Sequence, residues 1–198
     1  LLAGRAFVFH LHPMTSRELG PAFNLNNALC WGTLPGMFAL STELDKKRFL
    51  KAYAQTYLKE EIQIEQLVRK IEPFRKFLDV AAQSNGEVLN FSRLGREAAI
   101  EPKNVERYFE ILSDTLVGFY LEAYEKSVRK RQMKKPKFYF FDTGVCRALQ
   151  NMLDAAPAPR TYGYGRLFEQ FIILEYFRLN DYHEKNYRFS YLRTKDGA

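Results

Sequence analysis

Three carboxylates stand in strongly apolar surroundings in the C-terminal half of the sequence and are candidates for acid–base or metal chemistry. They are Asp142, Glu169 and Glu175. Metal-assisted hydrolysis requires carboxylates that converge on one site, so their spacing along the expected helix matters. Six residues of helical rotation place Glu169 and Glu175 on different faces. Taken alone, Glu169 is therefore expected to be a solvated or paired carboxylate rather than a catalytic one.

Two histidines in FVFHLH, His10 and His12, would share one face of a strand over residues 7–12. Two imidazoles at this spacing can bind one metal ion, but the sequence offers no third ligand nearby. The motifs GxxxxGK[ST], GxGxxG, CxxC, HExxH and GxSxG do not occur, so a nucleotide-phosphate loop, zinc hydrolysis and serine hydrolysis have no support. We therefore predict neither a metal site nor a cofactor site within this sequence.

Positive charge is concentrated in one stretch, KSVRKRQMKKPK, which carries seven basic residues in the twelve from 126 to 137 and no acid. An exposed stretch of this kind is suited to contact the phosphates of nucleic acid. The alternative is a solvated loop whose charge keeps the protein soluble. The residues expected to contact phosphate, here and on the polar side of the helix after Pro102, are Lys103, Asn104, Arg107, Arg129, Lys130, Arg131, Lys134 and Lys135.

The elements that would position these residues lie between positions 72 and 141. Phe74, Phe77 and Leu78 indicate one amphipathic helix, and residues 91–98, capped by Ser92, a second. A third begins at Pro102, with an apolar stripe at Val105, Tyr108, Phe109, Leu112 and Leu116. Strands at 117–124 and 138–141 would form a hairpin with the basic stretch as a flexible tip. This order predicts a winged helix-turn-helix, although small three-helix units also form lids and protein interfaces.

The remaining segments are predicted from local signals. Thr15 or Ser16 begins a short helix that ends before Gly20, residues 24–40 form helix, loop and short helix, and Ser41 or Thr42 caps a long helix that continues to residue 71. Asp142 caps a helix from Val145, and a loop follows over 151–165. The helix over 166–179 is apolar almost all round and should be covered on most sides. Residues 187–192 alternate as a strand.

Composition places the chain among ordinary globular proteins. Its 198 residues are 46% hydrophobic and 27% charged, with a formal net charge of +7. Two cysteines in apolar contexts indicate a reducing compartment, so we expect a cytoplasmic location. No apolar run approaches a membrane span and no secretory signal is visible, so no membrane partner is expected. Both ends of the sequence read as though a longer chain continued.

Several segments together resemble a group of predicted AAA-superfamily ATPases of bacteria and archaea. LLAGRAFVFHLHPMTSREL is similar to the end of their ATPase core, WGTLPGMF to the loop that follows, and FLKAYAQTYLKEEI to their YIxTYLERDI helix, except that Glu60 replaces Arg. LNFSRLGREAAIEPKNVERYFEILSDTLVGFYL resembles their winged helix. PKFYFFDTGVCRAL and YGRLFEQFIILEYFR resemble the start of their C-terminal domain of unknown function, which is similar to the PD-(D/E)XK nuclease fold.

The resemblance implies roles that the residues alone do not. Glu169 would be the first acid of a nuclease metal site, which remains incomplete because the sequence ends at Ala198 before the expected EVD and ExK. Arg5 would sense phosphate in the parent ATPase, for which ATP and Mg²⁺ are implied. The candidate partners are double-stranded DNA and the missing ATPase core, with the oligomeric state left open.

We therefore expect a mainly helical α+β chain of four parts. Residues 1–40 would be the residual edge of an ATPase domain, 41–71 a helical linker, 72–141 a winged helix and 142–198 an incomplete nuclease-like unit. The expected function is DNA binding within a larger ATPase. The alternatives are a regulatory lid that couples the ATPase state to a protein partner, and the remnant of a Mg²⁺-dependent nuclease.

Overall fold

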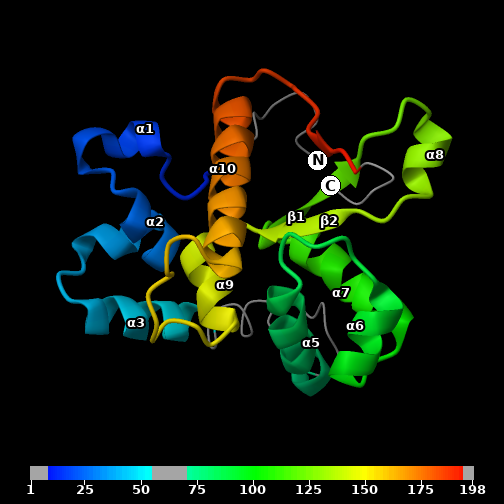
Figure 1. Cartoon of the computed structure of the whole chain (residues 1–198), viewed down its shortest axis with the longest axis horizontal. Helices are drawn as coiled ribbons and strands as arrows, with labels where there is room; N and C mark the ends of the chain where they lie inside the picture. Colours follow the sequence, from blue (N-terminus) through cyan, green and yellow to red (C-terminus); the bar gives the residue numbers. More distant parts are fainter. Residues whose placement is uncertain (1–8, 55–70, 194–198) are drawn as a thin grey trace, which may run out of the picture.

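The computed structural model describes residues 9–54 and 71–193 and has a mainly helical α+β fold with a small three-stranded sheet (Figure 1). Arg5, Glu60 and most of the expected linker helix lie outside the described residues. The helices and strands are α1 (Ser16–Leu19), η1 (Gly20–Ala22), α2 (Leu25–Trp31), η2 (Pro35–Ala39), α3 (Glu43–Ala52), α5 (Ile71–Gln83), α6 (Phe91–Ala98), α7 (Pro102–Asp114), β1 (Gly118–Ala123), α8 (Val128–Gln132), β2 (Lys137–Phe140), α9 (Thr143–Leu149), α10 (Tyr162–Tyr182) and β3 (Ser190–Tyr191).

The N-terminal helices begin at the side chains that the sequence indicated. Thr15 caps α1 in a reciprocal capping box with Glu18, and the Thr42 hydroxyl accepts a hydrogen bond from the Asp45 amide at the start of α3. The predicted strand over residues 7–12 is wrong for its described part, because residues 9–12 are irregular. His12 instead lies against the end of α10, where its backbone N–H donates to the Tyr182 hydroxyl at 3.0 Å.

Helices α5, α6 and α7 pack together as one three-helix unit below the sheet in the view of Figure 1. The apolar face of α5 is buried as predicted, and Val105, Phe109 and Leu112 of α7 are buried against it. The stripe ends there, because Leu116 has a φ of 60° and 60% exposure. The cap of α6 is Asn90 rather than the predicted Ser92, since the Asn90 side chain accepts the hydrogen bond from Arg93.

The β1–β2 hairpin follows α7 directly. The two strands are antiparallel, with Gly118 opposite Phe140 and Leu121 opposite Lys137. β3 pairs with the other edge of β1 in a parallel direction, which gives the order β2-β1-β3. The predicted final strand is thus reduced to two residues, held where Glu122 lies opposite Ser190.

Helix α9 is the buried centre of the molecule. Every residue from Thr143 to Leu149 is buried, and the helix contacts α2, α3, α5, α10 and β2. Asp142 caps it as predicted, because its carboxylate accepts hydrogen bonds from the backbone N–H groups of Val145 at 3.0 Å and Thr33 at 2.8 Å. One side chain therefore joins the start of α9 to the end of α2.

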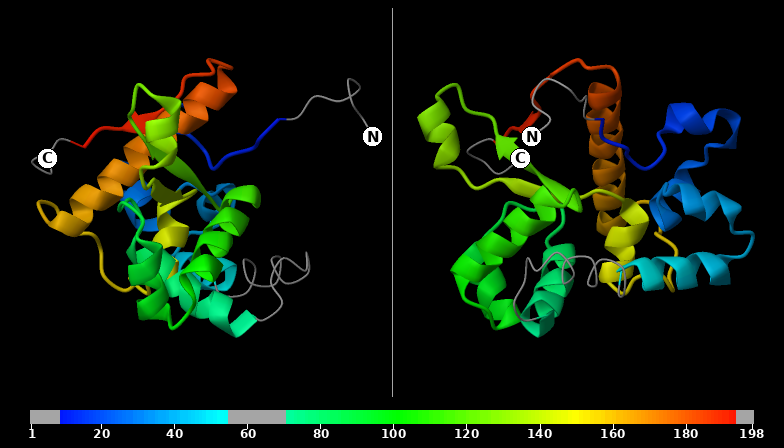
Figure 2. Two further views of the ribbon diagram at one scale, coloured as in Figure 1. Left: turned by 90° about the vertical axis from the view of Figure 1, so that its right-hand side faces the viewer. Right: turned by 180° about the vertical axis from the view of Figure 1, so that it is seen from behind.

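Helix α10 lies between the N-terminal helices and the sheet, as the views in Figure 1 and Figure 2 both show. Its predicted cover on most sides is confirmed, since Phe168, Glu169 and Tyr176 are the only exposed residues over 166–179. Its buried face includes the polar residues Gln170, Glu175 and Arg178, which the apolar pattern did not indicate. None of the described helices combines the length and the apolar character that a membrane span requires.

Candidate functional site

The polar side of α7 carries the first group of predicted phosphate contacts. Lys103, Asn104 and Arg107 are all exposed in the first two turns of the helix. Lys103 and Arg107 are four residues apart and so lie on the same side. Glu106 and Glu110 are exposed on the same helix, so its solvent-facing surface is of mixed charge.

The basic segment between β1 and β2 forms the short helix α8, where a flexible tip was predicted. The Ser127 hydroxyl caps it by accepting a hydrogen bond from the Lys130 amide at 3.5 Å. Arg131 is half-buried, and the five exposed cations of the segment are Lys126, Arg129, Lys130, Lys134 and Lys135. Within residues 9–54 and 71–193, none of these six side chains forms an ion pair. The segment therefore presents positive charge that no acid in the described part of the chain neutralises.

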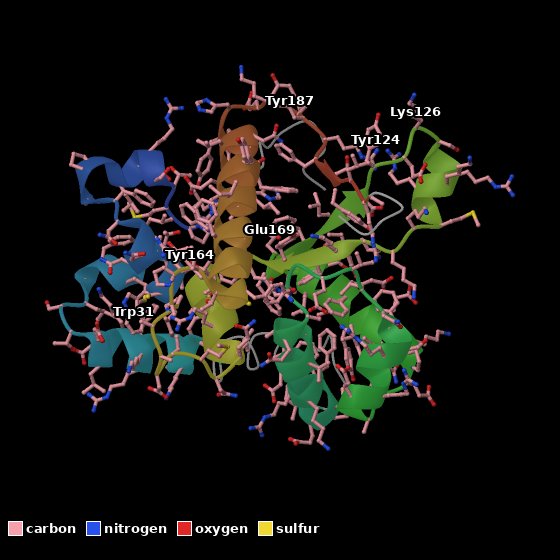
Figure 3. All side chains as sticks on the ribbon, viewed as in Figure 1. Trp31, Tyr124, Lys126, Tyr164, Glu169 and Tyr187 are labelled. Atoms are coloured by element: carbon pink, nitrogen blue, oxygen red, sulfur yellow. The ribbon has the colours of Figure 1, made fainter. Side chains whose placement is uncertain are left out.

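The two predicted cationic groups stand on different sides of the hairpin. In Figure 1 the helices α5 to α7 lie below the strands and α8 lies beyond their far end, above them, and the reverse view in Figure 2 agrees. Figure 3 shows Tyr124 and Lys126 at this outer end of the hairpin. The sequence analysis predicted that Lys103 and Arg107 form one phosphate-binding surface with the basic segment. In the structure they belong to two separate surfaces, one on α7 and one around α8.

The base of the α8 segment is held in place by the final strand. The Tyr191 hydroxyl donates a hydrogen bond to the Lys135 carbonyl at 2.5 Å, and the Leu89 amide donates to the Pro136 carbonyl at 2.9 Å. Val88 and Lys137 form an isolated antiparallel bridge beside these contacts. The segment therefore ends against β3 and the turn that follows α5.

Glu169 projects from α10 toward β2, where its carboxylate is already engaged. One of its oxygens accepts hydrogen bonds from the Tyr139 hydroxyl at 2.6 Å and the Lys137 ammonium at 3.0 Å. Partial burial raises the pKa of Glu169, but the hydrogen bonds from Tyr139 and Lys137 and the charge of Arg166 outweigh it, so the pKa lies below its usual value. Burial and the same contact with Glu169 raise the pKa of Tyr139.

A second carboxylate, Glu87, lies between two arginines beside this site. Its oxygens are 2.5 Å from an Arg166 nitrogen and 2.8 Å from an Arg93 nitrogen, and Arg166 also donates to the Asn85 carbonyl. Burial opposes ionisation of Glu87, but the hydrogen bonds from Arg93 and Arg166 prevail and lower its pKa. Glu87 and Glu169 are therefore both ionised and paired.

Glu87, Lys137, Arg166 and Glu169 line a hollow of about 630 Å³ between α10, β2 and β3. Tyr191 and Arg193 also line it. Sequence reasoning singled out only Glu169 among these, because the others come from segments far apart in the chain and belong to no motif. The single local signal was the run GYGRLFEQ, which carries Arg166 and Glu169 one helical turn apart.

The remaining predicted site residues are not gathered here. Arg5 lies outside the described residues. His12 forms a pair with Asp181 at 2.7 Å, whereas His10 is exposed. Among the described residues no group of three His, Cys, Asp or Glu side chains is placed to hold a metal ion. Glu175 contacts the Ser16 hydroxyl at 2.5 Å and Arg178 at 3.5 Å, so it and Glu169 have separate partners, as their spacing predicted.

Comparison with known proteins places the chain in a family without an assigned function. Two uncharacterized mycobacterial proteins, Mb2031c of Mycobacterium bovis and Rv2008c of Mycobacterium tuberculosis, are each 25% identical to it over 172 residues, which is 87% of this chain and 39% of each relative. The chain thus spans well under half the length of these relatives. No solved structure matches it with significant similarity. Residues 22–156 match the family described as a domain of unknown function, DUF8612, and the chain belongs to that family.

Proposed function

We propose that this chain is the C-terminal part of an AAA-superfamily ATPase and contributes binding of double-stranded DNA. In this proposal α5, α6, α7, β1 and β2 form a winged helix, and the segment around α8 is its wing. Three packed helices followed directly by an antiparallel hairpin support the proposal, since the element order and the packing both agree with such a unit.

The observation that carries the proposal is the unneutralised positive charge of the α8 segment. Its cations lie beyond the end of the hairpin, clear of the core, and they have no acidic partners within the part of the chain that the structure describes. Cations in this position can neutralise backbone phosphates and release the counterions condensed on DNA. Such contacts position a protein on a duplex without reading its sequence.

The ATPase assignment is supported by the sequence resemblance, and the mycobacterial relatives are long enough to contain a further domain. Under this proposal the parent protein uses ATP and Mg²⁺ and acts in the cytoplasm. β2, α9, α10 and β3 would open a nuclease-like unit, with Glu169 as its first acid. We do not favour nuclease activity for the chain, because no group of three His, Cys, Asp or Glu side chains among the described residues is placed to hold a metal ion, and one Glu169 oxygen already accepts hydrogen bonds from Lys137 and Tyr139.

A regulatory lid that contacts a protein partner is the second candidate. It is favoured by the mixed charge of α7, where Glu106 and Glu110 are exposed beside Lys103 and Arg107. It is also favoured by the position of α8 on the other side of the hairpin, which separates its cations from Lys103 and Arg107 on α7. In this case the positive segment would serve solubility alone.

Titration of duplex DNA at increasing salt separates the two candidates. The test variant changes Lys130, Arg131, Lys134 and Lys135 to Glu. If the segment neutralises phosphates, the variant should bind at least about ten-fold more weakly. The slope of the logarithm of its affinity against the logarithm of the salt concentration should become shallower by up to about 3.6. This is about 0.9 for each phosphate that the four side chains neutralise in the wild type.

The matched control reverses four exposed cations on other parts of the surface, Lys76, Arg160, Lys185 and Arg188, and so has the same net charge. A general electrostatic effect would weaken binding equally in both variants. Unchanged affinity in the α8 variant would refute DNA binding by the α8 segment. The regulatory lid would then be the better description of this part of the chain.

A further inference from the structure

Two neighbouring hollows on the surface of the chain together make up a groove. The hollow of about 630 Å³ beside Glu169 and Lys137 adjoins another of about 400 Å³ beside Tyr124, Lys134 and Lys135. Val88, Tyr191 and Arg193 line both hollows, so the two are adjacent. The groove therefore runs from the first turns of α10, past β3, to the base of the α8 segment.

Most of the charged side chains of this groove that do not form ion pairs with each other are positive. Glu87 is neutralised by Arg93 and Arg166, and Glu169 by Lys137. Of the remaining charged groups in the lining, Lys134, Lys135 and Arg193 are cations and Glu125 is an acid, and none of the four forms an ion pair within the described residues. The groove thus suits a flexible chain of negative charges.

Tyrosine rings are spaced along the same groove. Tyr162 at its α10 end is 79% exposed and Tyr124 at its α8 end is 54% exposed. Two of the rings are steadied by cations, because the Arg166 guanidinium lies 5.7 Å from the centre of the Tyr162 ring, and the Lys137 ammonium lies 5.7 Å from that of Tyr191. The exposed rings of Tyr124 and Tyr162 offer flat surfaces on which unpaired bases can stack.

We propose that this groove binds single-stranded nucleic acid. Lys134, Lys135 and Arg193 would contact phosphates, and bases would stack on Tyr124 and Tyr162. The two rings are useful only to unpaired bases, because the faces of bases in a duplex are already stacked on one another. The inference rests on the proposed function, since Lys134 and Lys135 belong to both surfaces. In this proposal the groove binds a single strand with unpaired bases, and the other cations of the α8 segment contact the duplex.

The test compares two fluorescent ligands with the full 198-residue chain, a thymidine oligonucleotide of about twelve nucleotides and a duplex of the same length, a size within the usual range for such sites. We expect tighter binding of the single strand. Tyr124→Ala and Tyr162→Ala should each weaken it by about five-fold or more and leave the duplex affinity unchanged. Tyr124→Leu should behave as Tyr124→Ala, because it retains apolar bulk but no aromatic face.

The matched control is Tyr187→Ala, which removes another tyrosine that is 65% exposed and does not line the groove. Tighter binding of the duplex, or a single-strand affinity that the Tyr124 and Tyr162 variants do not change, would overturn the groove and leave duplex binding by the α8 segment standing. Equal weakening by Tyr187→Ala would also overturn it. Absence of binding to either ligand would overturn both proposals.

Discussion

Arg166 and Glu87 form an ion pair with a nitrogen-to-oxygen distance of 2.5 Å, although 79 residues separate them in the chain. The pair joins the start of α10 to the turn between α5 and α6. The other Glu87 oxygen is 2.8 Å from Arg93 on α6, so a single carboxylate fixes the three-helix unit against α10. Glu87 and Arg166 also line the hollow beside Glu169.

Replacement of Glu87 by Gln should lower the free energy of unfolding at pH 7 by about 1 kcal/mol, a modest value because the carboxylate is partly solvated. Arg93 and Arg166 hold the pKa of Glu87 below its usual value. Its stabilisation is therefore complete above the unfolded carboxyl pKa of about 4.3 and is lost as the pH falls through the lower pKa of the folded state.

Urea unfolding of the wild type and the Gln variant across this pH range measures the effect, with the exposed Glu106→Gln as control. The difference between wild type and the Glu87 variant should vanish in acid. A difference that persists there unchanged would mean that shape, rather than charge, is responsible.

Replacement of Glu169 by Gln should act on stability rather than on catalysis. The change weakens a charge-assisted contact with Lys137 and the 2.6 Å hydrogen bond from Tyr139, so we expect a loss of about 1–2 kcal/mol. A double-mutant cycle with Tyr139→Phe should show that the two residues are coupled. Mg²⁺-dependent cleavage of DNA by the wild type, abolished in Glu169→Gln, would contradict this structural role.

Two glycines in helices should respond oppositely to alanine. A Cβ on Gly144 of α9 would lie 2.2 Å from the Trp31 carbonyl oxygen, which is backbone and cannot turn aside. A Cβ on Gly165 of α10 would meet nothing within 4 Å. Gly144→Ala should therefore cost about 2 kcal/mol or more through overpacking, and Gly165→Ala should stabilise by up to about 1 kcal/mol through helix propensity.

Thermal unfolding of the two glycine variants gives the comparison directly. Equal behaviour would mean that α9 and α2 are not in close contact.

Two phenylalanines on α10 distinguish its buried and open sides. Phe171 is 5% exposed and packs with α2, whereas Phe168 is 41% exposed. Phe171→Ala should cost about 3–4 kcal/mol because it leaves a cavity. Phe168→Ala should cost less than about 1 kcal/mol in denaturant unfolding. A large destabilisation by Phe168→Ala would show that a further surface covers this side of the helix in solution.

Local chemistry in the sequence was sufficient to locate most helices. Asp142 was recognised as a cap and Pro102 as the first residue of a helix, and the caps of α1 and α3 were each narrowed to two neighbouring residues, because each signal acts through atoms only a few residues away. The hairpin followed from two apolar runs around a basic one. The cap of α6 was misplaced by two residues, since Asn90 and Ser92 offer the same chemistry and only the path of the chain distinguishes them.

The buried face of α10 could not be predicted, because polar side chains occupy it. Gln170 donates to the Phe140 carbonyl at 2.9 Å and accepts from the Asn85 amide at 3.1 Å. Asn85 in turn accepts from the Phe140 N–H at 2.9 Å. Such a network satisfies groups on three segments, so its members are buried for reasons that no hydrophobic period reveals.

Most of the described helices, the hairpin and the positive charge of its tip follow from the amino-acid sequence alone, whereas helix α8 within that tip was not predicted. Three other features depend on how the elements pack: α7 and α8 lie on different sides of the strands, Glu169 faces Lys137, and β3 closes a groove beside Tyr124. The two groups of features differ in the distance along the chain over which the determining contacts act. Caps and turns depend on neighbouring residues, whereas a groove exists only where α10, β2 and β3 have packed, and their packing depends on the whole core.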